Sequence, residues 1–230
     1  FRSTNPVLSR TSEYDYVSDR PITYANVAVK TIFLIAIAAT TAILSISNGI
    51  FSPGLLIGGL IVGFIAVIVG TRSMRLAPYA GVIYAISEGF VLGLISLLFE
   101  VMYPGIVMTA ITTTGLVFVI MLLLFSTQVI KVNQKFASFM VVALMAVIIM
   151  SLLAVFIPGL FGGGFYIVIV LISAALSAFF LLLDFQAIKS SIDSGMDQKV
   201  GWILALGLMV TIVWIYIEML RLLAIFSRNN

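Results

Sequence analysis

The chain has 230 residues, of which 62% are hydrophobic and only 9% are charged, and its formal net charge at pH 7 is +3. This composition excludes a soluble globular domain, whose surface would be roughly a quarter to a third charged, and predicts an integral membrane protein. The small, scattered net charge gives no reason to expect nucleic acid as a partner. Cysteine and histidine are absent, so disulfides are excluded and any pH response near neutrality must come from carboxyl groups.

The first 25 residues are polar, with acidic and basic side chains mixed. They lack the apolar core and small-residue cleavage site of a signal peptide. We therefore expect residues 1–25 to form a polar cytoplasmic tail and residues 26–227 to form one membrane domain. Because the sequence does not begin with Met, we also expect the native start to lie upstream.

Seven apolar segments follow the tail, most of them close to the ~20 residues that a helix needs to cross a bilayer. Open sheet edges are not stable in lipid, so these segments predict an all-α bundle of transmembrane helices. The predicted spans are Val27–Ser47, Leu55–Val69, Tyr79–Leu98, Ile106–Phe125, Phe136–Phe156, Phe165–Leu183 and Val200–Phe226.

Basic residues occur in every second joint between the spans. They are Arg72 and Arg75, Lys131 and Lys135, and Lys189 and Lys199. Because short cytoplasmic loops carry the excess of Lys and Arg, this pattern predicts a cytoplasmic N-terminus. Arg221 and Arg228 near the far end of the last span weigh mildly against a full seventh crossing, which leaves open a last half-span that returns inward.

Pairs of glycines four residues apart occur in the second and third spans, at Gly59 and Gly63 and at Gly89 and Gly93. Such pairs let helix backbones approach closely. They predict a compact bundle without a wide pore.

Four charged residues, Glu88, Asp184, Glu218 and Arg221, lie inside or at the edge of the predicted spans. A charge at the centre of a membrane helix costs about 2.5–3.5 kcal/mol on insertion scales, so such residues usually face the protein interior or water and mark an ion path. Each also has a structural interpretation. Asp184 can reach headgroup water, and Glu218 can form a local pair with Arg221, whereas Glu88 lies near the bilayer middle.

Helical spacing aligns these charges with other polar residues, because positions three or four apart share a face. We predict three stripes, on the sixth, seventh and third spans, that face a common interior: Ser173, Ser177 and Asp184; Gly207, Thr211, Trp214, Glu218 and Arg221; and Gly81, Tyr84 and Glu88. Carboxylate and hydroxyl oxygens are the ligands that hard cations prefer. We take Asp184, Glu88 and Glu218 as candidate calcium ligands and Ser173, Ser177, Thr211 and Arg221 as pore-facing residues.

Motifs of catalysis are absent from the sequence: it has no metalloprotease helix, no phosphate-binding glycine loop and no cysteine cluster. We expect no enzymatic activity and no cofactor other than a bound calcium ion.

Four segments carry a resemblance to a known family: "RSTNPVLSR", "YAISEGFVLGLIS", "FLLLDFQAIKSSIDSG" and "WILALGLMVTIVWIYIEMLRLLAIF". Across nearly its whole length the chain resembles the Bax inhibitor (TMBIM, YccA-like) family, in its bacterial branch. The resemblance implies seven helices with the last one central, and a location in the bacterial cytoplasmic membrane.

The resemblance also implies a function. Family members are described as pH-sensitive calcium leak channels, in which an aspartate at the end of the sixth span pairs with another midway along the seventh. A basic residue near the second span closes the cytoplasmic mouth. Asp184 matches the first aspartate, and Arg72 or Arg75 matches the basic latch. Thr211 stands in place of the second aspartate, so either Glu88 or Glu218 substitutes for it or the pH gate is lost.

A second candidate function, from a different class, is an alternative to the leak channel. Bacterial relatives are also described as membrane interaction proteins that modulate a membrane protease. In that role the chain would bind its partner without conducting ions, and the charges inside the spans would be structural.

Cysteine labelling tests the predicted topology, and the absence of native cysteine makes the experiment clean. We expect Ser73→Cys to react from the cytoplasmic side and Gly163→Cys from the outer side, because the basic joints alternate with joints that carry no Lys or Arg. Membrane-impermeant maleimide on intact and opened cells is the measurement. Labelling of both positions from one side would contradict the span count.

Overall fold

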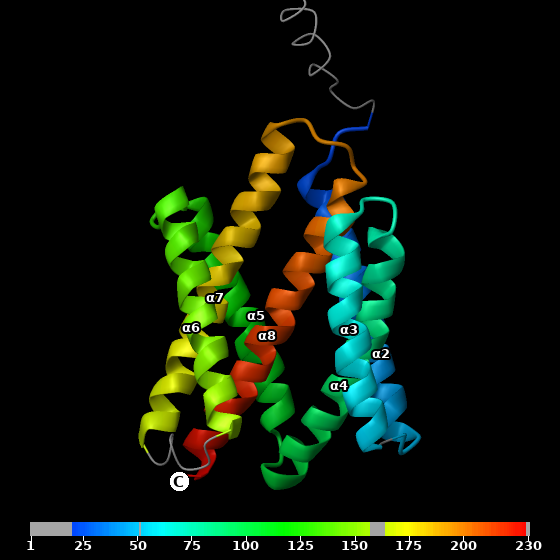
Figure 1. The fold of residues 1–230 in the computed structure, drawn as a ribbon, viewed down its shortest axis with the longest axis vertical. Coiled ribbons are helices and arrows are strands. Elements are labelled where there is room, and N and C mark those ends of the chain that lie inside the picture. The colour runs from blue at the N-terminus through cyan, green and yellow to red at the C-terminus, as the bar shows by residue number, and fades with distance from the viewer. Residues whose placement is uncertain (1–19, 51, 157–163, 229–230) are drawn as a thin grey trace, which may run out of the picture.

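The computed structural model describes residues 20–50, 52–156 and 164–228, which form a bundle of long α-helices (Figure 1). The helices are α2 (Tyr24–Ser47), α3 (Pro53–Arg72), α4 (Ala77–Met102), α5 (Ile106–Ser126), α6 (Gln134–Phe156), α7 (Gly164–Asp193) and α8 (Val200–Arg228). Seven of the described helices are long and apolar enough to cross a membrane. This confirms the predicted all-helical, seven-span architecture.

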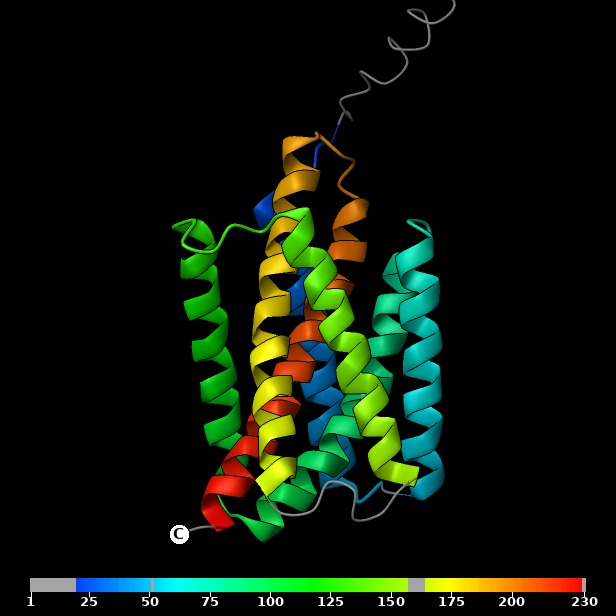
Figure 2. The same cartoon turned by 60° about the vertical axis from the view of Figure 1, so that its left-hand side comes forward.

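The connections between the helices alternate between two ends of the bundle (Figures 1 and 2). The turns at 73–76, 127–133 and 194–199 lie at one end together with the start of α2, and we call this end the basic end because the predicted basic joints lie there. The opposite end, the far end, holds the end of α2, the start of α3, the turn at 103–105 and the last turn of α8. The predicted outer joint at 158–163 and most of the predicted tail fall outside the described residues.

The last helix crosses the whole bundle, because α8 is continuous from Val200 at the basic end to Arg228 at the far end. A half-span that returns inward is therefore not present. Arg221 and Arg228 near the far end are compatible with a full crossing. Arg221 is half-exposed, and its long side chain can reach the membrane surface.

The predicted end of the sixth span at Leu183 is wrong. Helix α7 continues through Asp184 to Asp193, for nearly three further turns. The extra turns contain Phe185 and Ile188, which are buried against the rest of the bundle. Asp184 therefore lies within a helix and not at its end.

Local signals fix several helix ends. The Thr23 hydroxyl accepts a hydrogen bond from the Asn26 amide (3.2 Å) at the start of α2, and Ser52 does the same for Leu55 (3.2 Å) at the start of α3. Such caps satisfy amide groups that have no partner within the helix. At the far end the Glu100 carboxylate accepts from the amides of Gly105 (2.6 Å) and Val107 (3.0 Å), and so caps α5.

Helix α8 is the central element of the bundle. It packs against α2, α3, α4, α5 and α7. Four of its own residues are fully buried in these contacts: Leu206, Met209, Ile215 and Leu220. Helix α6 is the exception, because it packs only against α7 and lies on the outside (Figure 2). The last helix thus contacts five of the other six described helices, which confirms that it is central, as the family resemblance implies.

The glycine pairs bring α3 and α2 against α4. A methyl group added at Gly89 would lie 2.6 Å from the Ala38 carbonyl oxygen of α2, and one added at Gly93 would lie 2.5 Å from the Ser45 hydroxyl. Gly59 and Gly63 of α3 face α4 in the same way, with Val91 and Glu88 as their neighbours. The predicted close approach is confirmed, and it holds α2, α3 and α4 together as one layer beside α8.

The segment before α2 is fastened to the last helical hairpin. The Ile22 amide donates to the Met196 carbonyl (2.8 Å), and the Gln198 amide donates to the Arg20 carbonyl (2.9 Å). On α2, Lys30 Nζ donates to the Gln198 carbonyl (2.6 Å) and lies 5.3 Å from the centre of the Trp202 ring. We call residues 20–22 the strap, since they tie the first helix to the α7–α8 turn.

The glycine packing predicts the effect of one methyl group. Gly89→Ala should destabilise the protein by about 1–3 kcal/mol, because the added carbon would collide with backbone of α2 that cannot rotate away. Thermal unfolding in detergent is the measurement, and Gly115→Ala is the matched control.

Gly115 is also inside a helix, but nothing lies within 4 Å of a methyl group added there. Its substitution should leave the melting temperature unchanged or raise it, because alanine favours helix. Equal effects at both positions would contradict the packing interpretation.

Candidate functional site

A set of buried polar side chains lies between α7 and α8, which run side by side through the bundle (Figures 1 and 2). We call this set the polar seam, and it consists of Ser173, Ser177 and Asp184 on α7 and Thr211 and Glu218 on α8. Both helices present residues at three- or four-residue spacing to each other, as the sequence predicts. Two of the three predicted stripes therefore meet.

The inner part of the seam, nearer the basic end, is built around Asp184. Its Oδ1 faces Gly207, where an added methyl group would lie 3.9 Å away, so the absence of a side chain leaves room for the carboxylate. The Thr211 hydroxyl lies close enough to interact with Asp184 and also with the Gly207 carbonyl, at 3.3 Å. One hydroxyl proton serves only one acceptor at a time, so the carboxylate is poorly satisfied.

The outer part of the seam is built around Glu218, which is only 2% exposed. Its Oε1 accepts from three donors: the Ser173 hydroxyl at 2.7 Å, Trp214 Nε1 at 3.2 Å and the Arg221 guanidinium at 3.3 Å. The predicted local pair with Arg221 is therefore present. It is not the whole environment, because Ser173 comes from the neighbouring helix and fixes α7 to α8.

Both carboxylates of the seam keep one oxygen without a partner. In the described part of the chain, the buried side-chain oxygens or nitrogens that lack any hydrogen bond are Asp184 Oδ2, Glu218 Oε2 and Thr114 Oγ1. Native proteins satisfy the large majority of such atoms, so each exception points to a function, an ion or a water molecule. All three lie on α5, α7 and α8, which pack against one another.

The two carboxylates lie at different depths. Thr211, beside Asp184, and Glu218 are seven residues apart on α8, which corresponds to about 10 Å along the axis. Ser177 lies between them on α7, but its hydroxyl donates to the Ala174 carbonyl (2.8 Å) of its own helix. The seam is thus a line of oxygen atoms with an acidic group near each end.

Glu88 does not join this line. It is buried on α4 next to Tyr84, and its Oε2 faces Gly63 of α3. No hydrogen bond, ion pair or ring contact links it to α7 or α8 across residues 20–50, 52–156 and 164–228. The third predicted stripe therefore faces α2 and α3 and not the seam.

The two predicted latch residues lie at the basic end, exposed in and beside the α3–α4 turn. Within the described residues neither Arg72 nor Arg75 forms an ion pair with Asp184. Helix α3 does not contact α7, because α8 lies between them. A methyl group at Gly70 would lie 2.6 Å from Leu206, and the next residue of α8, Gly207, faces Asp184, so α3 and Asp184 reach α8 at the same depth from different sides.

Metal binding by a cluster of acidic groups is not supported. Among the described residues no group of three or more His, Cys, Asp or Glu side chains lies close enough together to hold a metal ion. The three predicted ligands, Asp184, Glu88 and Glu218, are therefore separate positions, and each could offer a cation only its own carboxylate and nearby hydroxyl or carbonyl oxygens.

Comparison with known proteins identifies the family to which this arrangement belongs. The family model described as "Bax inhibitor 1 like" matches residues 5–228, which is nearly the whole chain. The chain belongs to the Bax inhibitor 1-like family. A search of curated proteins gave no match. The family match confirms the resemblance that the sequence motifs predict.

Three polar positions of this Bax inhibitor-like protein were not predicted as site residues. Nothing in the sequence distinguishes Thr114 from the other threonines of α5. Thr112 and Thr113 donate to carbonyls of their own helix, whereas the Thr114 hydroxyl has no partner among the described residues. Glu100 lies five residues before Gly105, which has a positive φ of 87°, and this spacing could have indicated a carboxylate that caps the next helix. Lys30 donates to the Gln198 carbonyl (2.6 Å), and no pattern in the sequence links two residues that lie 168 positions apart.

Two serines of the seam provide a matched pair of substitutions. Ser173→Ala should destabilise the Bax inhibitor-like protein by about 1–3 kcal/mol, because a buried carboxylate loses a donor. Ser177→Ala should cost less, since the Ser177 hydroxyl bonds only within α7. Thermal unfolding in detergent gives both values. A double variant of Ser173→Ala with Glu218→Gln should show coupling, whereas additive effects would mean that the two side chains do not interact.

Proposed function

We propose that this Bax inhibitor-like protein is a pH-sensitive cation leak channel, with calcium as the first candidate ion, and that ions pass along the polar seam. The observation that carries the proposal is the pair of carboxylate oxygens, Asp184 Oδ2 and Glu218 Oε2, which are buried without partners at two depths of the same interface. Hard cations take oxygen ligands of this kind.

The chemistry of the seam fits a leak better than a storage site. Each acidic position offers one carboxylate with a few hydroxyl or carbonyl oxygens, so binding at either position would be weak. Conduction needs sites that bind well enough to admit an ion and weakly enough to release it. Two weak sites about 10 Å apart along α8 would let an ion move in steps.

We place the basic end in the cytoplasm, because the short turns at this end carry the excess of Lys and Arg. Asp184 then belongs to the inner half of the path and Glu218 to the outer half. The bacterial cytoplasmic membrane is the proposed location.

Asp184 is the proposed gate, and Arg72 or Arg75 is the proposed latch that closes it. Because α3 contacts α8 and not α7, the contact requires an arginine to extend past α8, near the level where Gly70 of α3 packs against Leu206 and Gly207 faces Asp184. A guanidinium can hold a carboxylate with two parallel hydrogen bonds. Acidification would protonate Asp184, remove the charge that the latch holds and raise the leak.

Few other charges compete with this response. The helices packed against α7 are α2, α5, α6 and α8, and no charged side chain from them contacts Asp184 within the described residues. Lys30 on α2 bonds to Gln198 and Asn26, and Arg221 on α8 bonds to Glu218.

Calcium flux into dye-loaded liposomes, measured across pH, tests the gate. Asp184→Asn should remove the pH dependence of the flux, because the amide cannot titrate. Asp193→Asn is the matched control, since it makes the same change in an exposed residue at the end of the same helix. Arg72→Ala or Arg75→Ala should raise the leak at neutral pH.

Two results would contradict the proposal. If folded Asp184→Asn conducts like the parent at every pH, Asp184 is not the gate. If the parent conducts no cation at any pH, the chain is not a leak channel, and the role of a membrane interaction protein that modulates a protease would be the one to examine by co-purification. Flux with Glu88→Gln, which lies off the seam, tests separately whether Glu88 contributes.

A further inference from the structure

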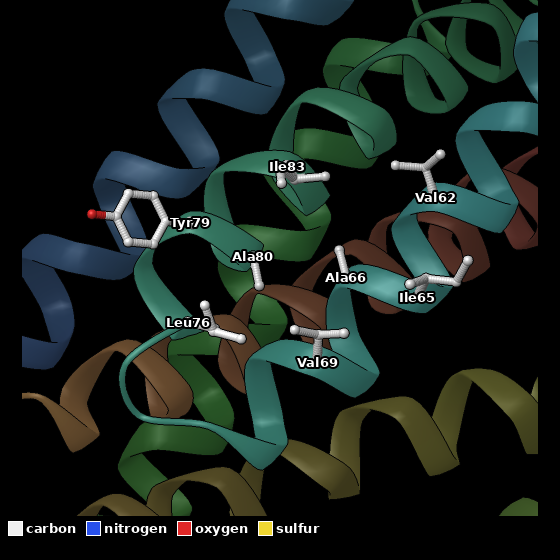
Figure 3. Close-up of a pocket in the computed structure, with 8 residues that line it drawn as sticks. All are labelled: Val62, Ile65, Ala66, Val69, Leu76, Tyr79, Ala80 and Ile83. Atoms are coloured by element: carbon white, nitrogen blue, oxygen red, sulfur yellow. The ribbon is translucent and has the colours of Figure 1, made fainter.

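A groove on the outer surface of the α3–α4 hairpin takes no part in the proposed conduction. We call it the hairpin groove. It has a volume of about 340 Å³, and its walls include Val62, Ile65, Ala66 and Val69 from α3 and Tyr79 and Ile83 from α4 (Figure 3). It begins next to the α3–α4 turn and runs along both helices.

The lining of the groove is apolar, so it suits an apolar ligand. Ile65, Val69 and Ile83 are each more than a third exposed although they are apolar, as expected for side chains that contact lipid. Tyr79 alone among the lining residues has a polar side-chain atom, and its hydroxyl points away from the cavity (Figure 3). A polar or charged ligand would lose its hydration in this groove without gaining a partner.

The dimensions of the groove favour a thin occupant. The α3 wall from Val62 to Val69 is about 10 Å long. A single hydrocarbon chain is thinner than a helix, which is about 10 Å wide with its side chains, and it can lie along a wall of this length.

The mouth of the groove carries two positive charges. Arg72 ends α3 three residues after Val69, and Arg75 directly precedes Leu76, which also lines the groove. The turn that holds them is tight, because the Ser73 carbonyl accepts from the amides of Leu76 (3.1 Å) and Ala77 (2.9 Å). Both arginines are exposed, and no acidic group pairs with either in the described part of the chain.

We propose that the hairpin groove and these two arginines form a binding site for one anionic phospholipid. An acyl chain lies in the groove, and the phosphate group is bound by Arg72 and Arg75, whose guanidinium groups match phosphate oxygens in pairs. Basic residues at the end of an apolar groove between membrane helices are the arrangement that recognises an anionic headgroup. The site shares its arginines with the proposed latch, but its test measures lipid binding and not ion flux, so either proposal can fail without the other.

Native mass spectrometry of the full chain in detergent tests the site. The probes are phosphatidylglycerol and phosphatidylcholine with identical acyl chains, so that only the headgroup charge differs. The variants are Arg72→Gln with Arg75→Gln, and Val69→Phe, which fills the groove from its lipid-facing side. The matched control is Lys131→Gln with Lys135→Gln, which removes two exposed charges at the same end of the bundle, away from the groove.

The parent should bind phosphatidylglycerol in preference to phosphatidylcholine. Removal of both arginines should weaken phosphatidylglycerol binding about 30-fold, since one basic residue near an anionic lipid contributes roughly fivefold. Val69→Phe should weaken the binding of both lipids, and the lysine control should change neither. Unchanged thermal unfolding of the Val69→Phe and arginine variants would show that the fold is kept.

Three outcomes would overturn the proposal. Equal binding of the two lipids, or an equal loss in the lysine control, would mean that the attraction is general surface charge. Loss in the arginine variant with no effect of Val69→Phe would mean that the groove holds no acyl chain. A dimer mass that Val69→Phe abolishes would assign the groove to a second copy of the chain.

Discussion

Backbone amide and carbonyl groups find no water inside a bilayer, and this constraint determines the architecture of the whole chain. Each crossing must satisfy its own backbone as a continuous helix, which is why α8 and the extended α7 run without a break. Association between such helices gains nothing from the hydrophobic effect, because lipid is as apolar as the core. The bundle therefore depends on close packing at small residues and on polar contacts between helices.

These two means of association divide the bundle. Helices α2, α3 and α4 are joined through glycines, where backbone meets backbone at Gly89 and Gly93. Helices α7 and α8 are joined through the Ser173–Glu218 hydrogen bond and through the contact of Thr211 with Asp184. At these glycines the contact is made by backbone atoms and small side chains, whereas the seam retains an unpaired oxygen on each of its two carboxylates. A chemical function fits the second interface for that reason.

Sequence reasoning recovered the number and type of helices, because long apolar runs have few alternatives in a membrane. It recovered the stripes on α7 and α8 for a similar reason, since helical spacing fixes which residues share a face. It failed where the answer depends on a partner helix. The end of α7 was placed at the first charge, although Phe185 and Ile188 continue the buried face beyond it. Glu88 has the same spacing pattern as the seam residues, and only the packing of α4 against α3 shows that it faces elsewhere.

The contact of Lys30 on α2 with the α7–α8 turn, beside the strap, gives the chain an order of assembly. Lys30 and Gln198 are joined by a hydrogen bond, and 168 residues separate them in the sequence. At a synthesis rate of about 5–20 residues per second, the partner of Lys30 emerges roughly 10–30 s after Lys30 itself. During that interval the first helix is in the membrane with a lysine that has no carbonyl to bind, and the headgroup layer is the only place where its charge is solvated. The earliest helix to be made can therefore reach its final depth only when the last hairpin arrives.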